Sequence, residues 1–292
     1  MDINNLTAFI EVAKQQSFSK AAEILFLTQP AISKRITALE TELGTALFNR
    51  INRKVTLTEA GRALLPRAQN LRYELEDIRR IASQLSEQVA GSLSMGTSHH
   101  IGLHRLPPFL SFFNTTYPDV HLDLHFVGSE QACEAVEQGD LELAFITLPS
   151  ELPPQLHAKA LWQDELHIVV NREHKLAQFA EVSLEALQAE RCILPGKDTY
   201  TYQLIAQAFQ ALTHKLNIYL TTHYLDTLKM LVSAGFGWSV LPHTLVDKTM
   251  VVLNTPVKLT RQLGVITHRR RSLSNAASTL LTHLDRFSDD KA

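Results

Sequence analysis

The chain has 292 residues, of which 45% are hydrophobic, and its formal net charge at pH 7 is −2. A chain of this length usually forms two or three domains, and no apolar run approaches the roughly 20 residues of a membrane-spanning helix. The start, MDINNLTAF, has no basic-then-apolar leader, and the 2 cysteines make no disulfide framework, so we expect a cytoplasmic protein.

Charge and histidine content divide the chain into two differently composed parts. Positive residues crowd the stretch that contains Arg50, Arg53 and Lys54. All 13 histidines, in contrast, fall at or after His99. We therefore expect two modules with different functions.

The amino-terminal part begins with helical patterns. An amphipathic stripe is formed by Ile3, Leu6, Phe9, Ile10 and Ala13. A short helix is predicted from Lys20 to Leu25, with Ser19 as its N-cap, and Ala21 and Ala22 are small enough for a close helix crossing. A third helix follows after a tight turn, which is the arrangement of a helix-turn-helix.

The third helix lies within FLTQPAISKRITALETELG, residues 26–44, and has two distinct faces. Thr28 is its predicted N-cap and Gly44 its stop. One face is an apolar stripe made of Ile32, Ile36, Leu39 and Leu43. The other is polar and includes Gln29, Pro30, Ser33, Lys34 and Thr37. A solvated surface helix has the same pattern, but glutamine can bond adenine, lysine can bond guanine and serine can donate to bases or phosphate, so the neighbouring helices favour DNA recognition.

A basic segment follows this helix. Val55 and Leu57 alternate with Thr56 and Thr58 as in a short strand. Arg50, Arg53 and Lys54 are predicted on the loop before that strand. These charges predict a wing that reaches the DNA backbone or minor groove.

The run FSKAAEILFLTQPAISKRITALETELGTALFNRINRKVTLTEAG resembles the winged helix-turn-helix of LysR-type transcriptional regulators. The AA pair, TQPAIS, LE-x-ELG-x-xLF-x-R and LT-x-AG match that family's pattern in order. The resemblance implies double-stranded DNA as a partner. It places the base and phosphate contacts on Thr28, Gln29, Pro30, Ser33, Lys34, Arg50 and Arg53, to which the polar face adds Thr37 and the wing adds Lys54.

A long helix is predicted after the wing. Its apolar residues recur at spacings of three, four and seven: Leu64, Leu71, Leu75, Ile78, Ala82 and Leu85. Such a seam needs a partner, which is either a second copy of the helix or the chain's own carboxyl-terminal domain. The resemblance implies that this helix dimerises the protein, and a two-fold dimer implies an inverted-repeat operator. It also implies a possible tetramer and RNA polymerase as a possible partner.

From Ser92 onward, short strand-like runs alternate with helical stretches at 130–138, 200–214 and 224–235, which predicts an α/β fold with mostly parallel sheets. This part resembles the family's effector domain, similar to periplasmic binding proteins, and QGDLELAF and LVSAGFGWSVLP are further local matches. The predicted fold is therefore α plus α/β. Its parts are a winged helix-turn-helix (1–58), a linker helix (59–90) and a two-lobed effector domain (91–292), with lobe one at 91–161 and 266–292 and lobe two at 162–265.

An effector cleft is expected between the lobes, because ligands of open α/β folds sit at the carboxyl ends of strands, near helix N-termini. Stretches of this kind are 97–101, 128–129, 195–202 and 224–227. Hydroxyls and backbone N–H groups there suit a small polar or anionic ligand, and a protonated histidine would favour a carboxylate. For Ser129, a purely structural helix cap is the alternative. The resemblance to the family places His100, Ser129 and the loop 199–202 in this cleft. With the neighbouring polar residues, the candidate effector residues are Ser98, His99, His100, Ser129, Thr147, Thr199, Tyr200, Thr201, Tyr202 and Asp226.

The sequence gives little support for metal binding, redox chemistry or catalysis. His121 and His125 would be roughly 13 Å apart along a strand, too far to share one metal ion. Cys133 and Cys192 could form a redox switch, but their apolar surroundings favour buried structural thiols. The sequence has no G-x-S-x-G, H-E-x-x-H or P-loop motif, so we expect no catalytic residues, metal or cofactor. The competing class is a small-molecule binding protein whose amino-terminal helices only oligomerise it.

Overall fold

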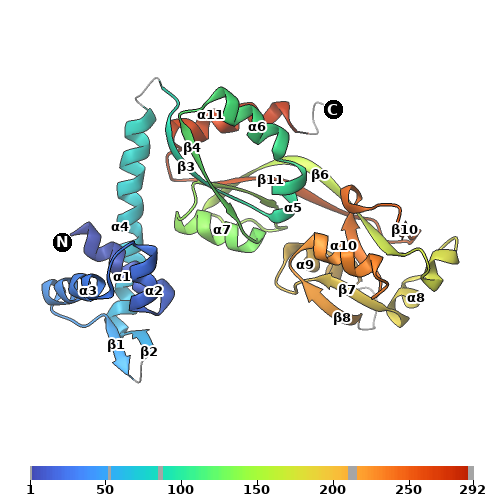
Figure 1. Ribbon diagram of the computed structural model, residues 1–292, viewed down its shortest axis with the longest axis horizontal. Coiled ribbons are helices and arrows are strands. Elements are labelled where there is room, and N and C mark those ends of the chain that lie inside the picture. Colours follow the sequence, from blue (N-terminus) through green and yellow to red (C-terminus); the bar gives the residue numbers. More distant parts are fainter. Residues whose placement is uncertain (1, 52–53, 85–87, 210–215, 289–292) are drawn as a thin grey trace. The chain divides into compact units, whose positions relative to one another are not determined.

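The computed structural model describes residues 2–51, 54–84, 88–209 and 216–288. The chain forms two compact units, Met1–Ser83 and Gln84–Ala292 (Figure 1). Among the described residues, none of the helices combines the length and apolar character that crossing a bilayer would require.

The first unit is a helical domain with a small hairpin. Its elements are α1 (Ile3–Gln15), α2 (Phe18–Ile24), α3 (Gln29–Leu43), β1 (Phe48–Ile51), β2 (Lys54–Leu57) and α4 (Glu59–Gln84). The side chains of Phe9, Phe18 and Phe48 meet edge to face at its centre, with ring centroids 5.5 Å apart for Phe9–Phe48 and 5.8 Å for Phe18–Phe48. This core holds the three short helices together.

The caps of α3 are as predicted. The Thr28 hydroxyl accepts a hydrogen bond from the Ala31 N–H at 3.4 Å, and Gly44 ends the helix with a φ of 66°. The predicted cap of α2 is wrong. Ser17, with extended backbone angles, accepts from the Lys20 N–H at 3.3 Å and caps a helix that starts at Phe18. Phe18 is buried in the core, and this burial fixes the helix start ahead of Ser19.

The wing is an antiparallel hairpin in which Arg50 pairs with Val55 and Ile51 with Lys54. Arg50 and Lys54 therefore lie in strands, and not on a loop before a single strand as predicted. The reason is that Phe48–Ile51 supplies the second strand that Lys54–Leu57 needs to satisfy its backbone. Arg53 lies outside the described residues, as do the side chains of Arg50 and Lys54.

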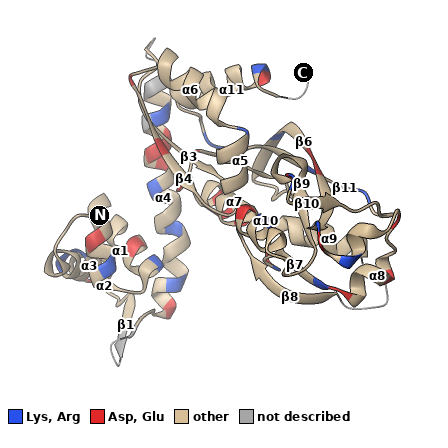
Figure 2. Cartoon of the chain, turned by 45° about the vertical axis from the view of Figure 1, so that its right-hand side comes forward, with Lys and Arg blue, Asp and Glu red and all other residues tan. Residues whose placement is uncertain are grey.

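Helix α4 is long and partly apolar on its surface. Ala68 and Tyr73 are buried, whereas Leu71, Ile78 and Ile81 are exposed large hydrophobic residues. Figure 2 marks positions of both basic and acidic residues along the same helix. Part of the predicted seam is thus exposed within this chain, and Leu85 lies outside the described residues.

The second unit contains a seven-stranded sheet in the order β10-β6-β11-β5-β3-β4, with β9 also paired to β6, and a two-stranded sheet of β7 and β8. The strands are β3 (Gly91–Thr97), β4 (Val120–Phe126), β5 (Leu143–Thr147), β6 (Leu156–Asn171), β7 (Arg191–Pro195), β8 (Asn217–Thr222), β9 (Ser239–Pro242), β10 (Met250–Val252) and β11 (Leu259–His268). The helices are α5 (His99–His104), α6 (Pro107–Thr116), α7 (Ser129–Gln138), α8 (Leu184–Ala189), α9 (Tyr200–Phe209), α10 (Leu225–Ser233) and α11 (Asn275–His283).

The expectation of mostly parallel sheets is wrong for the described strands. β3 runs parallel to β4 and β5, and β7 runs parallel to β8. β11, however, is antiparallel to both β5 and β6, and β6 is antiparallel to β9 and β10. The reason is that β6 and β11 are long strands that carry the chain from one lobe to the other and back, so they run in opposite directions (Figure 1).

Each lobe has its own core. Leu93, Phe109, Phe113 and Phe145 belong to the core of one lobe, and the core of the other contains Trp238. Both cysteines are buried, as predicted. Burial raises the pKa of the Cys133 thiol, and it raises the pKa of Cys192 to about 12, so both thiols are protonated and unreactive near neutral pH.

Candidate functional sites

Helix α3 separates an apolar face from a polar one. Ile32, Ile36 and Leu39 have an exposed fraction of 0%. Thr28, Gln29, Pro30, Lys34 and Thr37 are exposed, and Ser33 is half-buried. The predicted polar face is therefore free of the protein's own core and available to another molecule.

Two contacts organise the region around this face. The Gln29 side-chain amide donates to the Ser33 hydroxyl at 3.0 Å, which links two of the candidate base-reading residues. The Glu40 carboxylate accepts from the backbone N–H groups of Leu47 at 2.7 Å and Phe48 at 3.3 Å. Through Glu40, α3 fixes the start of the wing hairpin.

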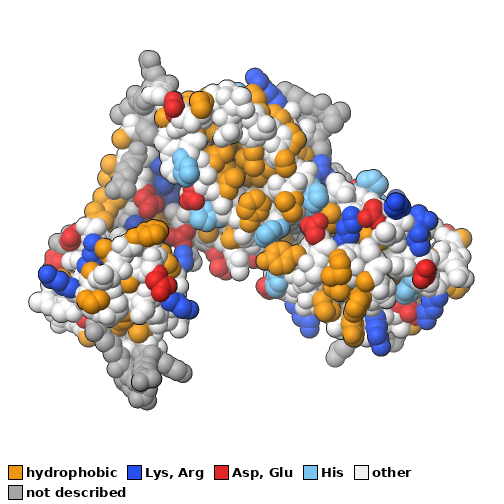
Figure 3. All heavy atoms as spheres, viewed as in Figure 1, with side chains coloured by type: hydrophobic (Ala, Val, Ile, Leu, Met, Phe, Trp, Pro, Cys, Tyr) orange, Lys and Arg blue, Asp and Glu red, His pale blue; other side chains and the backbone are white. Residues whose placement is uncertain are grey.

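The second candidate site is a cavity of about 330 Å³ between the two lobes of the second unit. The predicted effector residues that line it are Ser98, His99, His100, Ser129, Thr147, Thr199 and Thr201. Each of the four predicted stretches contributes to its wall, the last through Tyr224 and Leu225. Figure 3 shows histidine side chains on the surface where the two lobes meet.

Tyr200, Tyr202 and Asp226 do not line this cavity. The Tyr200 side chain packs against the apolar cluster around α7, and Tyr202 packs against the core of lobe two. Asp226 faces His104, with 3.8 Å between carboxylate oxygen and ring nitrogen. Their positions next to helix starts explain both the prediction and its failure, because neighbouring residues of a helix point in different directions.

Helix N-termini converge on the cavity. Gly128 and Tyr224 precede α7 and α10, and neither supplies a side-chain cap. At α9 the Tyr200 N–H is already bonded to the Glu130 carboxylate at 2.6 Å, a contact between the lobes. The N-termini of α7 and α10 therefore keep backbone N–H groups that favour an oxygen-rich ligand, while Glu130 and Asp226 in their first turns offset part of the positive end of each helix.

Two buried hydroxyls of the cavity wall, one from each lobe, already accept hydrogen bonds. Ser129 Oγ accepts from the Thr147 N–H at 3.0 Å, and Thr201 Oγ1 accepts from Arg261 Nη1 at 2.9 Å. A hydroxyl whose oxygen accepts in this way keeps its own proton to donate. Each group can therefore donate its proton to a ligand oxygen.

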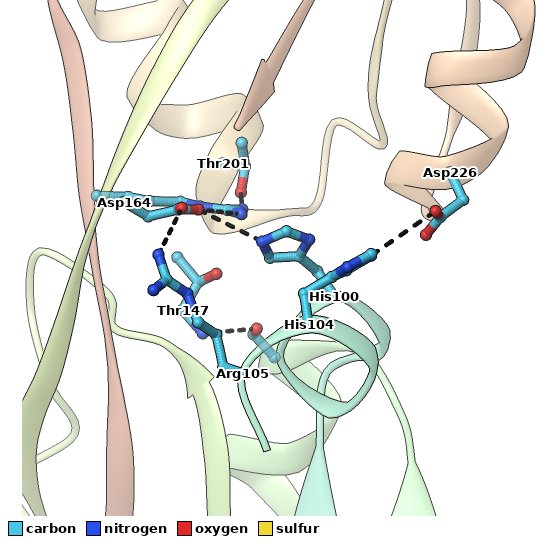
Figure 4. Close-up of polar contacts among 9 residues, drawn as sticks. His100, His104, Arg105, Thr147, Asp164, Thr201 and Asp226 are labelled. Carbon is cyan, nitrogen blue, oxygen red and sulfur yellow. Dashed lines mark hydrogen bonds and ion pairs between the residues drawn. The ribbon is translucent and has the colours of Figure 1, made fainter. Parts of the chain in front are cut away.

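A buried ionic cluster stands behind these hydroxyls (Figure 4). Arg261 on β11 is the register partner of Asp164 on β6, and its Nε lies 2.8 Å from Oδ2 of that carboxylate. Arg105 Nη2 lies 3.6 Å from Oδ1 of Asp164, and His100 Nε2 lies 3.7 Å from Oδ2. Burial lowers the pKa of Arg261, while the charge of Asp164 raises it, and an arginine stays charged in either case.

His100 is neutral in this environment. Burial and the positive charge of Arg261 lower its pKa from 6.5 to about 2, although Asp164 is close by. The carboxylate does not offset this lowering, because 3.7 Å exceeds hydrogen-bond distance and Arg261 already neutralises Asp164. A protonated His100 that attracts a carboxylate is therefore a wrong expectation.

Sequence reasoning missed Glu130, His223 and Arg261 of the cavity wall, and it did not single out Asp198 and Tyr224 within the predicted stretches. Glu130, Asp198, His223 and Tyr224 lie within or beside the predicted stretches, so their polar side chains after strand ends were a signal that could have identified them. Arg261 gave no such signal, because it lies within β11, a strand that connects the two lobes, and not after the end of a strand.

The chain matches known family models over most of its length. Residues 3–62 match the bacterial regulatory helix-turn-helix protein of the lysR family, and residues 86–288 match the LysR substrate binding domain. An HTH-type transcriptional regulator of Bacillus subtilis, YwqM, is 31% identical over 246 residues, which are 83% of this chain and 82% of that protein.

Solved structures share the fold. A full-length OxyR variant from Pseudomonas aeruginosa has a TM-score of 0.70 at 22% identity, covering 99% of this chain and 96% of that one. Full-length CbnR complexed with its target DNA has a TM-score of 0.65 at 20% identity and covers 100% of both chains. With these matches over both units, the chain belongs to the LysR family of transcriptional regulators.

Proposed function

We propose that this protein is a ligand-responsive regulator that binds a specific DNA sequence as a dimer or tetramer and carries out no catalysis. The observation that carries the proposal is the polar face of α3, which stays exposed while Ile32, Ile36 and Leu39 fill the core. We place the regulator in the cytoplasm, with RNA polymerase as a further partner.

The proposed DNA contacts divide into two groups. Gln29, Ser33 and Lys34 would read base edges in the major groove, because their donors and acceptors match those of adenine and guanine. The other proposed contacts position the protein on the duplex: Thr28, Pro30, Thr37, Arg50, Arg53 and Lys54. The CbnR structure, in which a protein of this fold is complexed with its target DNA, supports DNA as the partner.

Helix α4 is the proposed dimerising element. Leu71, Ile78 and Ile81 expose apolar surface that a second copy of the helix would cover. A two-fold dimer presents two copies of α3, so the proposed operator is an inverted repeat with half-sites separated by whole turns of DNA.

The interlobe cavity is the proposed effector site, and its ligand is polar or anionic. Ser129 and Thr201 would donate to ligand oxygens from opposite lobes, and the N-terminus of α7 would favour negative charge. Ser98, His99, His100, Thr147 and Thr199 complete the proposed wall. A ligand held by both lobes changes DNA binding only if its affinity differs between the protein's alternative arrangements.

DNA binding is tested by fluorescence anisotropy with a duplex from the region upstream of the protein's own gene. Replacing Ser33 or Lys34 by alanine should reduce the preference for that duplex over unrelated DNA. Arg50→Ala should weaken binding to all sequences and flatten the salt dependence. Equal losses from all three variants would contradict the assigned roles.

The competing function, a small-molecule binding protein with oligomerising helices, predicts a different result. In that case no duplex would bind more tightly than unrelated DNA of equal length. The polar face that contains Gln29, Ser33 and Lys34 disfavours this function, because the core of an oligomer contact is expected to be more apolar.

A further inference from the structure

We propose that Phe26, in the turn between α2 and α3, contacts the 5-methyl group of a thymine in the operator and so contributes to sequence preference. This inference rests on the proposed DNA-binding function. It adds a residue that belongs to neither the base-reading nor the positioning group described above. Its contact is apolar, whereas those proposed for Gln29, Ser33 and Lys34 are hydrogen bonds.

The first observation is the exposure of Phe26. Its side chain is 95% exposed, and the next most exposed large hydrophobic residue in the described part of the chain is Ile78, at 62%. The chain neighbours Leu25 and Leu27 are half-buried and pack against the core of the first unit. The Phe26 ring therefore adds nothing to this core. A single exposed hydrophobic residue is common on protein surfaces, so exposure alone does not assign a function.

The second observation is the backbone conformation of Phe26. Its φ is 54°, in the left-handed region, and Gln16 is the other non-glycine residue with a positive φ among those that the structure describes. The left-handed conformation brings Cβ close to the following carbonyl oxygen, so glycine is the usual residue there. A phenylalanine at this position therefore destabilises the turn relative to glycine.

The hydrogen bonds of the turn show why it needs a left-handed residue. The Phe26 N–H donates to the Glu23 carbonyl at 3.2 Å, and the Leu27 N–H donates to the Ala22 carbonyl at 2.8 Å. These two bonds form a Schellman motif, which ends α2 and places Phe26 at the position where glycine is most common. Neither bond uses the ring. A strained position that carries an exposed ring is explained best by a molecule outside this chain.

Continuity with α3 identifies that molecule. Phe26 lies two residues before Thr28, the N-cap of α3, so at most about 7.6 Å separates their Cα atoms, which are two steps of 3.8 Å apart. Thr28 and Gln29 begin the polar face that is proposed to enter the major groove, and recognition helices contact bases with their N-terminal residues. A duplex on that face therefore comes within reach of the Phe26 ring.

The chemistry of the major groove selects the group that the ring contacts. Phenylalanine has no hydrogen-bond donor or acceptor, so it cannot read the polar base edges. The apolar group that bases present in this groove is the 5-methyl group of thymine, and phenylalanine is among the side chains that contact it. The ring is therefore assigned to a thymine methyl group.

A protein partner is the alternative for an exposed ring. A stable protein interface buries about 800 Å² on each partner. This area is far larger than the apolar surface that Phe26 and Ile24, which is 48% exposed, offer at this turn. The next residues, Thr28 and Gln29, are exposed and polar. These features favour DNA over a protein partner.

The experiment uses the full-length protein and the duplex from the region upstream of its own gene. Each thymine is replaced in turn by uracil, which lacks the 5-methyl group and keeps the same base pairing. Fluorescence anisotropy at one salt concentration measures the affinities. At one or more positions, uracil should weaken binding by about fourfold, which is the contribution of one buried methyl group.

Phe26→Gly should bind the thymine and uracil duplexes equally at one such position, and should bind the thymine duplex about fourfold more weakly than the unaltered protein does. Phe26→Asn, which also tolerates the left-handed conformation, should behave in the same way and so separates loss of the ring from flexibility of glycine. Gln16→Gly is the matched control, because it places glycine at the exposed left-handed end of α1, and it should keep the difference.

Stability without DNA provides an independent measurement. Phe26→Gly and Gln16→Gly should both raise the Tm, because each relieves a left-handed non-glycine residue at the end of a helix. A lower Tm of Phe26→Gly would overturn the proposal, because the ring would then stabilise the free protein and its exposure would need no partner.

Three DNA-binding results would also overturn the proposal. The first is that Phe26→Gly removes the effect of uracil at no position, and the second is that it weakens binding to every duplex equally. The third is unchanged DNA binding with a smaller oligomeric mass, which would assign the ring to a protein contact. These results leave the DNA-binding function intact, because the unaltered protein still prefers its own duplex. Failure of the unaltered protein to bind any duplex would contradict both proposals.

Discussion

The two candidate sites use polar side chains in opposite ways. On α3, Gln29 and Lys34 are exposed, and the stability of the helix comes from the apolar face behind them. At the interlobe cavity, Arg261 in the wall and Asp164 behind it are 7% and 2% exposed, so these polar groups are themselves part of the core. Substitutions should therefore separate binding from folding on α3, whereas at the cavity they should affect both.

The largest effect is expected at the buried ionic cluster. Asp164→Ala would leave Arg261 charged, buried and without its carboxylate, which should lower the free energy of unfolding by about 3–5 kcal/mol. Urea unfolding of the full-length chain measures this loss. Asp198→Ala, an exposed aspartate paired with His223, is the control and should change the same quantity by less than about 0.5 kcal/mol. Similar losses in both variants would remove the contrast between buried and exposed sites.

A large effect is also expected on the hidden face of α3. Ile36→Ala should destabilise the protein by about 3 kcal/mol, because its side chain is fully buried. Thr37→Ala, the next residue on the exposed face, should change stability by less than about 0.5 kcal/mol. Thermal unfolding of the two variants checks the orientation of the helix. A larger loss of stability from Thr37→Ala than from Ile36→Ala would mean that the polar face is the buried one.

The third prediction concerns pH and His100. Its folded pKa of about 2 lies below its usual 6.5, so below pH 6.5 the unfolded chain binds a proton that the folded chain does not. Stability should fall as the pH decreases from 6.5, by about 1.4 kcal/mol per pH unit. His100→Phe should lose this contribution while keeping those of the other titratable groups. Parallel slopes of unfolding free energy against pH for the two proteins would show that His100 titrates normally.

The smallest effect tests the start of α2. Ser17→Ala should cost about 1 kcal/mol, because Ser17 caps the helix through the Lys20 N–H. Ser19→Ala, within the exposed first turn, should cost much less. Comparison of the Tm values of the two variants shows which serine caps α2. A larger loss from Ser19→Ala would restore Ser19 as the cap predicted from the sequence.

The exposed face of α3 could be predicted from the sequence, and the lining of the buried cavity only in part. The faces of α3 follow from local spacing, so the pattern alone places Ile32, Ile36 and Leu39 correctly. Leu43, predicted in the same stripe, is exposed because it is the last residue of the helix. The pair of Asp164 and Arg261, in contrast, joins residues 97 positions apart through the register of β6 and β11. No local pattern encodes that register, and the neutral state of His100 depends on it.

Duplex DNA binding by a Gln29→Ala variant tests the central claim about α3 most directly. The quantity to measure is the ratio of affinities for the operator duplex and for a shuffled duplex of equal length, at one salt concentration. We expect this ratio to fall by about tenfold or more while the Tm stays unchanged, because an exposed base-reading side chain is lost. An unchanged ratio, with the protein still folded, would contradict the assignment of this face to DNA.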